Sequence, residues 1–136
     1  MRALVLSFAS SLAITSAHAG EMAKEGNDSS TIYYVTIAPN EYAGIKRTDS
    51  SDEMFDRMTV RSHYHGDGHG DLVMMDAVGD EIFATWEGHG GVWHWVRGTG
   101  KYDGISGEGV WTCNQLRSPD GTSMSICPHK MSWKLP

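Results

Sequence analysis

The sequence predicts an all-β protein of seven or eight short antiparallel strands, arranged as a sandwich or a closed barrel. Its 136 residues include 16 glycines, five tryptophans, five tyrosines and three phenylalanines, a composition typical of strands and tight turns. Apolar and polar residues alternate with period two in several runs, which turn-forming clusters separate at intervals of roughly ten residues. No window of 12 or more residues shows convincing helical periodicity with caps.

The expected strands begin at Thr31 and follow one another to the C-terminus. Gly79 and Asp80 form a two-residue connection between two of them, which is a hairpin signal. In the run from Val92 to Val96, Trp93 and Trp95 share one face and His94 lies on the other, so only one set can line an interior. The expected strands are residues 31–38, 54–64, 71–78, 81–86, 91–97, 108–116 and 122–133.

The N-terminus predicts a secretory signal peptide over residues 1–19. Arg2 supplies a positive charge, residues 3–14 form an apolar run too short to span a bilayer, and residues 17–19 (AHA) match a small-x-small cleavage site. We expect residues 20–30 to be a flexible mature N-terminus and residues 31–136 to form the barrel domain. The product is therefore expected to be periplasmic or secreted, with no integral membrane segment.

Composition and charge narrow the classes of partner. The formal net charge is −6, from 11 Lys and Arg against 17 Asp and Glu, and no basic cluster is visible. Nucleic-acid binding depends on such clusters, so a nucleic-acid partner is not expected. With 40% hydrophobic and 21% charged residues, the chain is typical of one globular domain. The sequence leaves the oligomeric state open.

The two cysteines, Cys113 and Cys127, predict a disulfide. An even number of cysteines in an exported chain favours a bridge, and the segment 118–121 (SPDG) between them is a turn signal. The two positions are symmetric about residue 120, so a hairpin turning there brings them opposite each other. A reactive thiol is the alternative.

The glycine-rich segment 98–109 (GTGKYDGISGEG) carries a family resemblance. It resembles the GGTGKYxGxxGxG turn of the allene oxide cyclase and dirigent-like barrel proteins, and residues 78–83 (VGDEIF) resemble their DGDxIF hairpin. Arg97 stands where the family has the first glycine of the turn. The resemblance implies a calycin-like barrel of eight antiparallel strands with a cavity for a small, mostly apolar molecule. It carries over no catalytic residue, because the matched segment is a structural turn.

Two functions follow for such a cavity. One is cofactor-independent lyase, isomerase or cyclase chemistry on an aromatic or terpenoid- or lipid-like molecule, and the other is non-catalytic periplasmic binding of such a ligand. Acid–base candidates are His94, Glu87 and Asp76, since an ionisable group among apolar residues acquires a shifted pKa. Indoles suit flat ligands, and four are expected to line the cavity: Trp86, Trp93, Trp95 and Trp111.

A histidine-rich run supplies a third hypothesis. His63 and His65 are spaced to point to one face of a strand, and His69 follows in the adjoining turn, with Asp67 and Asp71 as further candidate ligands. These residue types in this spacing point to zinc or copper. A solvated hairpin tip, made flexible by the intervening glycines, is the alternative.

Overall fold

A computed structural model describes residues 23–49, 53–88 and 90–136, so the expected signal peptide over residues 1–19 lies outside the described residues. The described chain contains strands and two short 3-10 helices: β1 (Glu25–Ala38), β2 (Glu41–Thr48), η1 (Glu53–Phe55), β3 (Met58–Tyr64), β4 (His69–Met75), β5 (Glu81–Glu87), β6 (Val92–Gly98), η2 (Gly100–Tyr102), β7 (Glu108–Trp111), β8 (Asn114–Arg117) and β9 (Ser123–Lys134).

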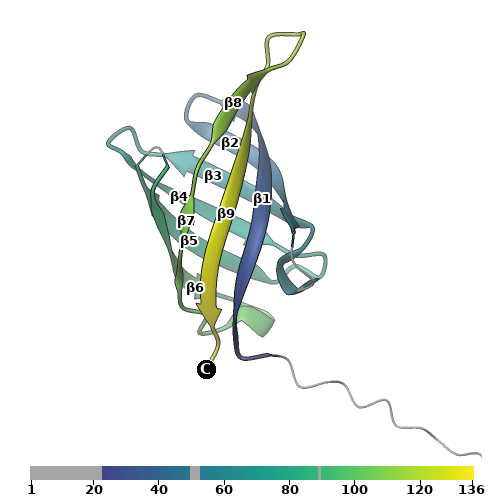
Figure 1. The fold of residues 1–136 in the computed structure, drawn as a ribbon, viewed down its shortest axis with the longest axis vertical. Coiled ribbons are helices and arrows are strands. Elements are labelled where there is room, and N and C mark those ends of the chain that lie inside the picture. The colour runs from purple at the N-terminus through teal and green to yellow at the C-terminus, as the bar shows by residue number, and fades with distance from the viewer. Residues whose placement is uncertain (1–22, 50–52, 89) are drawn as a thin grey trace, which may run out of the picture.

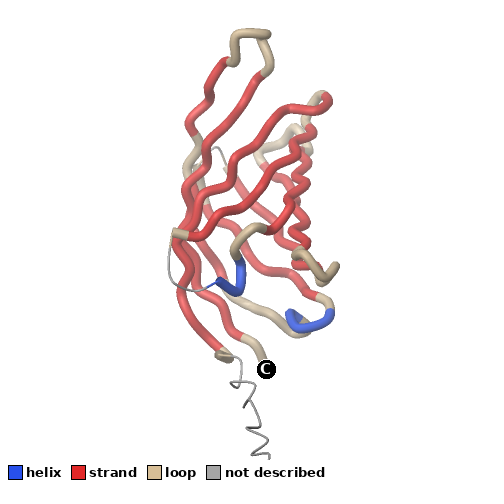
Figure 2. The backbone as a smooth tube through the Cα atoms, turned by 90° about the vertical axis from the view of Figure 1, so that its right-hand side faces the viewer, coloured by secondary structure: helices blue, strands red, loops and turns tan. Residues whose placement is uncertain are grey.

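The strands form one closed antiparallel barrel (Figure 1). Each strand from β1 to β6 pairs with the next, β7 pairs with β9, and β9 pairs back with β1 to close the ring. β7 and β8 bind successive parts of β9, around residues 129–131 and 123–126, and so act as one interrupted strand. The barrel therefore has eight strand positions, which confirms the predicted fold class. The β8–β9 hairpin extends beyond the other strands (Figures 1 and 2).

Several segments differ from the sequence-based expectation. The strand expected over residues 54–64 begins only at Met58, because residues 53–55 form η1, and the strand expected over residues 108–116 is interrupted between Trp111 and Asn114. β1 begins at Glu25, so a flexible stretch over residues 20–30 is wrong for residues 25–30. Asp28 and Ser30 in this stretch point inward and are buried, and Ser30 pairs with His129 of β9. β2, which the sequence analysis did not predict, pairs with β1 and β3 on either side.

The barrel interior is filled by aromatic side chains that lie over cross-strand glycines. Trp86 is the direct partner of Gly70, and a Cβ added to Gly70 would lie 2.1 Å from the indole. Trp93 and Gly109 form the same arrangement, again with 2.1 Å to the indole. Each glycine therefore leaves room for a ring that the narrow barrel could not otherwise accept. Two further direct pairs share this geometry: Tyr34 with Gly44, and Trp133 with Gly26.

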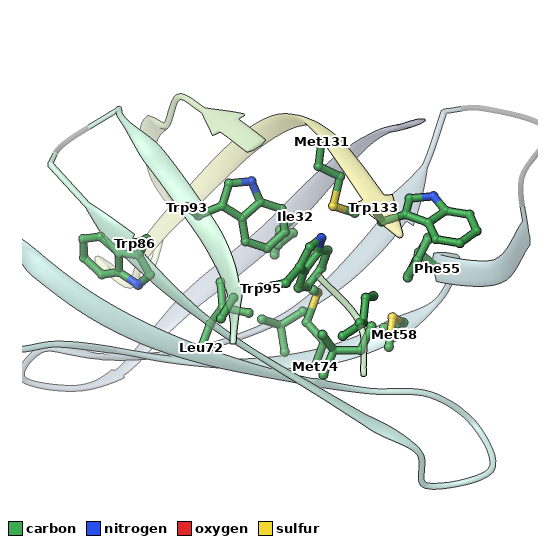
Figure 3. Close-up of a cluster of buried hydrophobic side chains, with 14 of the residues drawn as sticks. Ile32, Phe55, Met58, Leu72, Met74, Trp86, Trp93, Trp95, Met131 and Trp133 are labelled. Atoms are coloured by element: carbon green, nitrogen blue, oxygen red, sulfur yellow. The ribbon is translucent and has the colours of Figure 1, made fainter. Parts of the chain in front are cut away.

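One end of the barrel is closed by η1. Its Phe55 is fully buried and stacks on Trp95 and Tyr102, with ring centroids 6.2 and 5.8 Å away. The hydroxyl of Tyr102, from η2, donates a hydrogen bond to the carbonyl of Met54 at 2.9 Å and so holds the two 3-10 helices together. Figure 3 shows Phe55 and Trp133 at one end of the buried cluster and Trp86 at the other.

A buried ion pair anchors this closed end. Lys46 of β2 and Asp28 of β1 are both fully buried and lie 2.6 Å apart. The Lys46 ammonium also donates to the carbonyl of Phe55 at 3.0 Å, and the Thr48 hydroxyl donates to Asp28. Because every charge is paired and hydrogen-bonded, the desolvation cost of burying both groups is offset.

The predicted disulfide is confirmed. Cys113 is bonded to Cys127, with their Cα atoms 4.2 Å apart. The neighbouring β8–β9 register, in which Asn114 faces Ile126, is symmetric about residue 120, as the hairpin prediction requires. The bridge joins β9 to the short segment between the end of β7 and the start of β8. None of the helices in the described part of the chain is long and apolar enough to cross a membrane.

The glycine–indole packing predicts a specific stability coupling. Gly70→Ala should destabilise the protein by about 1–3 kcal/mol, the usual range for overpacking a core, because the new methyl group meets the Trp86 ring and the His63 carbonyl oxygen. The double variant Gly70→Ala/Trp86→Leu should lose less than the sum of the two single changes, as urea unfolding will measure. Strict additivity would contradict the proposed contact.

Candidate functional site

The end of the barrel opposite Phe55 contains a cavity of about 130 Å³. Its wall comes from all nine strands and from Cys113. It is partly open to solvent, and among its lining residues Tyr42 and Tyr64 are part-exposed and Gln115 is exposed. The lining residues are Tyr34, Tyr42, Ser62, Tyr64, Leu72, Trp86, Trp93, Trp111, Cys113, Gln115, Ser125, Cys127 and His129.

Three of the four tryptophans expected in the cavity line it: Trp86, Trp93 and Trp111. Trp86 stacks on Tyr64 and meets Trp111 edge-on, with ring centroids 5.7 and 5.4 Å away. Trp95 points inward as well, but it stacks on Phe55 at the closed end and does not line the cavity. Most of the expected apolar wall is therefore present.

His94 and Glu87 do not reach this cavity. Alternation in β6 turns Trp93 and Trp95 inward, which places His94 on the outer face with 48% of its side chain exposed. Its nearest charged partner is Glu108, also exposed, at 3.8 Å. Glu87 is exposed on the outer face of β5, next to the inward Trp86. The interior face required for their acid–base roles is thus occupied by the indoles.

Asp76 is a turn-forming residue. Its carboxylate accepts hydrogen bonds from the backbone N–H groups of Val78, Gly79 and Asp80, and it lies 2.6 Å from the Lys101 ammonium. Burial opposes its ionisation, but the bonds from Lys101 and the backbone outweigh burial and lower the pKa. The raised pKa expected of a proton donor is therefore contradicted. Because Asp76 forms this turn, β4 ends at Met75, and residues 76–80 make a hairpin loop longer than the expected two residues.

The histidine run lies on the barrel exterior. The rings of His63 and His65 are neighbours, with centroids 4.9 Å apart. His65 lies 2.9 Å from Asp71, and His69 lies 3.4 Å from Asp67. Within residues 23–49, 53–88 and 90–136, no group of three or more His, Cys, Asp or Glu side chains is arranged to hold a metal ion.

His129 is the cavity residue that the sequence analysis missed. It lies on the inner face of β9 with 5% of its surface exposed, and its ring is 5.0 Å from that of Trp93. Neither ring nitrogen has a hydrogen-bond partner among the described residues. Burial, with a smaller contribution from the Lys46 ammonium, lowers the pKa of His129 to about 3, and the Asp28 carboxylate opposes this only in part. The imidazole is therefore neutral at physiological pH.

Some of the other polar groups of the cavity are hydrogen-bonded within the protein, and others have no described partner. The Trp86 indole donates to Ser62 at 3.1 Å, and the Tyr64 hydroxyl accepts from the Gly68 backbone at 3.3 Å. The buried N–H of Trp111 has no partner in the described chain. Tyr34 is 9% exposed, its hydroxyl takes part in none of the described hydrogen bonds, and burial raises its pKa.

No family model matches this chain, and no curated protein matches it. Among solved structures, the chain is similar to the pterocarpan synthase dirigent protein GePTS1, with a TM-score of 0.45 and 10% sequence identity. The match covers 85% of this chain and 90% of that one. The fold assignment given above rests on the strand pairings of this chain.

The lowered pKa of His129 predicts a loss of stability in acid. The unfolded imidazole, with an ordinary pKa near 6.5, takes up a proton as the pH falls below that value, while the folded one stays neutral down to about 3. The free energy of unfolding should therefore fall by on the order of 3 kcal/mol between about pH 6.5 and about pH 4 because of this group alone.

The variant His129→Leu isolates this contribution. It removes the titrating group and keeps the other acidic and basic residues, so its unfolding free energy should decline less steeply over the same pH range. Urea unfolding at a series of pH values measures both curves. Parallel curves for the two proteins would show that His129 is not buried in its neutral form.

Proposed function

We propose that the barrel binds a small, mostly apolar molecule in this cavity. The observation that carries the proposal is the partly open cavity lined by Trp86, Trp93, Trp111 and three tyrosines, which no other part of the described chain fills. Aromatic walls offer a flat ligand stacking surfaces and release water when the ligand enters. Clefts of this kind, apolar with a few polar groups, are the usual form of small-molecule sites.

The volume favours a single ring over a longer molecule. A dry cavity of about 150 Å³ is known to accept benzene, whereas sites for drug-sized ligands span about 300–1,000 Å³. The cavity here encloses about 130 Å³. An aromatic ligand therefore fits better than the terpenoid- or lipid-like molecules that the sequence also allowed.

Catalysis of the lyase, isomerase or cyclase kind is a second candidate, and His129 is the observation that favours it. A neutral, buried imidazole beside a bound molecule is able to accept a proton from it. The three acid–base candidates from the sequence lie outside the cavity, so this role would fall to His129. Binding requires no such proton transfer, so we rank binding ahead of catalysis as the proposed function.

We also propose that the protein works outside the cytoplasm, in the periplasm or after secretion. The signal-peptide pattern of residues 1–19 supports this, and so does the disulfide between Cys113 and Cys127, because such bonds persist in oxidising compartments.

Binding can be tested with benzene and ¹⁵N spectra of the indole N–H groups. Signals of the cavity-lining Trp86 and Trp111 should shift as benzene is added, and the signal of Trp133, near the closed end, should not. Decanoate, a long chain with a charge, should leave the indole signals unchanged. No shift of any indole at saturating benzene would overturn the proposed function.

A matched pair of variants checks where benzene binds. Ser125→Trp adds an indole at the inner face of β9, where Ser125 lines the cavity, and should abolish binding. Met124→Trp adds the same group on the exposed outer face of that strand and should leave binding unchanged. Equal effects of the two variants would place the ligand elsewhere.

Export predicts a definite mature N-terminus. Protein expressed with residues 1–19 in a bacterial host should be recovered from the periplasm with Gly20 as its first residue, as intact-mass measurement will show. Changing Ala19 to a bulky residue should block this cleavage. Recovery of the uncut chain from the cytoplasm would contradict the proposal.

A further inference from the structure

The chemistry of the cavity wall restricts the ligand further than size does, and this inference rests on the proposed function. The wall contains no Lys, Arg, Asp or Glu side chain in the described chain. The nearby ammonium of Lys46 is already bound by Asp28 and by the Phe55 carbonyl. A charged ligand would therefore lose its hydration without gaining an opposite charge, which is strongly unfavourable. The cavity is suited to a neutral molecule.

The cavity wall offers several hydrogen-bond donors that take part in none of the described hydrogen bonds. The Tyr34 hydroxyl carries one proton to donate, and the buried Trp111 indole carries another and accepts none. A neutral His129 carries a third on one ring nitrogen, while its other nitrogen is an acceptor. Trp111 and His129 are direct partners in the β7–β9 register, so these two groups are neighbours on one wall. Native proteins rarely leave buried donors unsatisfied, and each such group calls for an explanation.

The unpaired Trp93 nitrogen has a different explanation. It lies against the backbone at Gly109, where a Cβ would approach it to 2.1 Å, and its position follows from the glycine–indole packing. The same holds for Trp133, which lies over Gly26. Of the buried indole N–H groups without a partner, the one that this packing does not explain and that lines the cavity is that of Trp111.

We propose that the cavity is selective for neutral single-ring carbonyl compounds, namely cyclic ketones, lactones or ring aldehydes, whose oxygen accepts a hydrogen bond from the Tyr34 hydroxyl. A carbonyl oxygen offers two lone pairs and no proton, so it can accept from two of these donors at once. A carboxylate would bring an unpaired charge. The ring occupies the space between the aromatic walls.

Three six-membered ring compounds separate these possibilities: cyclohexanone, its hydrocarbon analogue methylenecyclohexane, and cyclohexanecarboxylate. Their affinities are measured by titrating the indole N–H signals of the full mature protein. Cyclohexanone should bind about five to ten times more tightly than methylenecyclohexane, the gain that one neutral hydrogen bond gives. Cyclohexanecarboxylate should bind more weakly than either.

The variant Tyr34→Phe removes the hydroxyl and keeps the ring over Gly44. It should abolish the preference for cyclohexanone while leaving methylenecyclohexane binding unchanged. Tyr33→Phe is the matched control, since Tyr33 precedes Tyr34 on β1 but is exposed on the outer face of the barrel, and it should keep the preference. The dispersion of the indole signals reports that each variant is folded.

The outcomes distinguish this inference from the proposed function. Equal binding of cyclohexanone and methylenecyclohexane would overturn carbonyl selectivity and leave the binding of small rings intact. Tighter binding of cyclohexanecarboxylate would overturn neutrality, and a preference retained by Tyr34→Phe would overturn the role of that hydroxyl. If none of the three compounds moves an indole signal while benzene does, the inference fails and the proposed function stands.

Discussion

Fitting large rings into a narrow barrel is the constraint on which the rest of this structure depends. An eight-stranded barrel encloses too little space for a bulky side chain at every inward position. The chain meets this limit by setting glycines opposite aromatic residues, as at Gly70 and Trp86, so that one ring occupies the volume of two side chains. The cavity lies where the inward residues of β9 become small, at Ser125 and Cys127.

The strands that the sequence predicts well are those with apolar inward faces. The stretch from Glu81 to Trp86 and the run around Trp93 alternate clearly, and the structure places strands there within a residue of the expected bounds. β2 and the first part of β1 were not predicted, because their inward residues include Lys46 and Asp28. Each of these charged residues, considered alone, is expected to be exposed to solvent. Their burial depends on a partner 18 positions away, which no local pattern contains.

The candidate site was predictable only in part for a similar reason. Period-two alternation separates the two faces of β6 but does not say which face is interior. The sequence alone therefore allowed either His94 or Trp93 to line the cavity, and the strand pairings of the barrel decide between them. His129 had a usable signal, since it shares the inward set of β9 with Cys127 and Met131. The alternation of β9 places His129 on the same face as Cys127 and Met131, and all three are buried.

The closure of one end by Phe55 also limits how a molecule could pass through the barrel. Because that end is filled by stacked rings and the exposed lining residues lie at the other, a molecule bound as proposed would leave by the route through which it entered. A second molecule would then enter only after the first had left. The residence time of the bound molecule would set the rate at which the cavity is refilled.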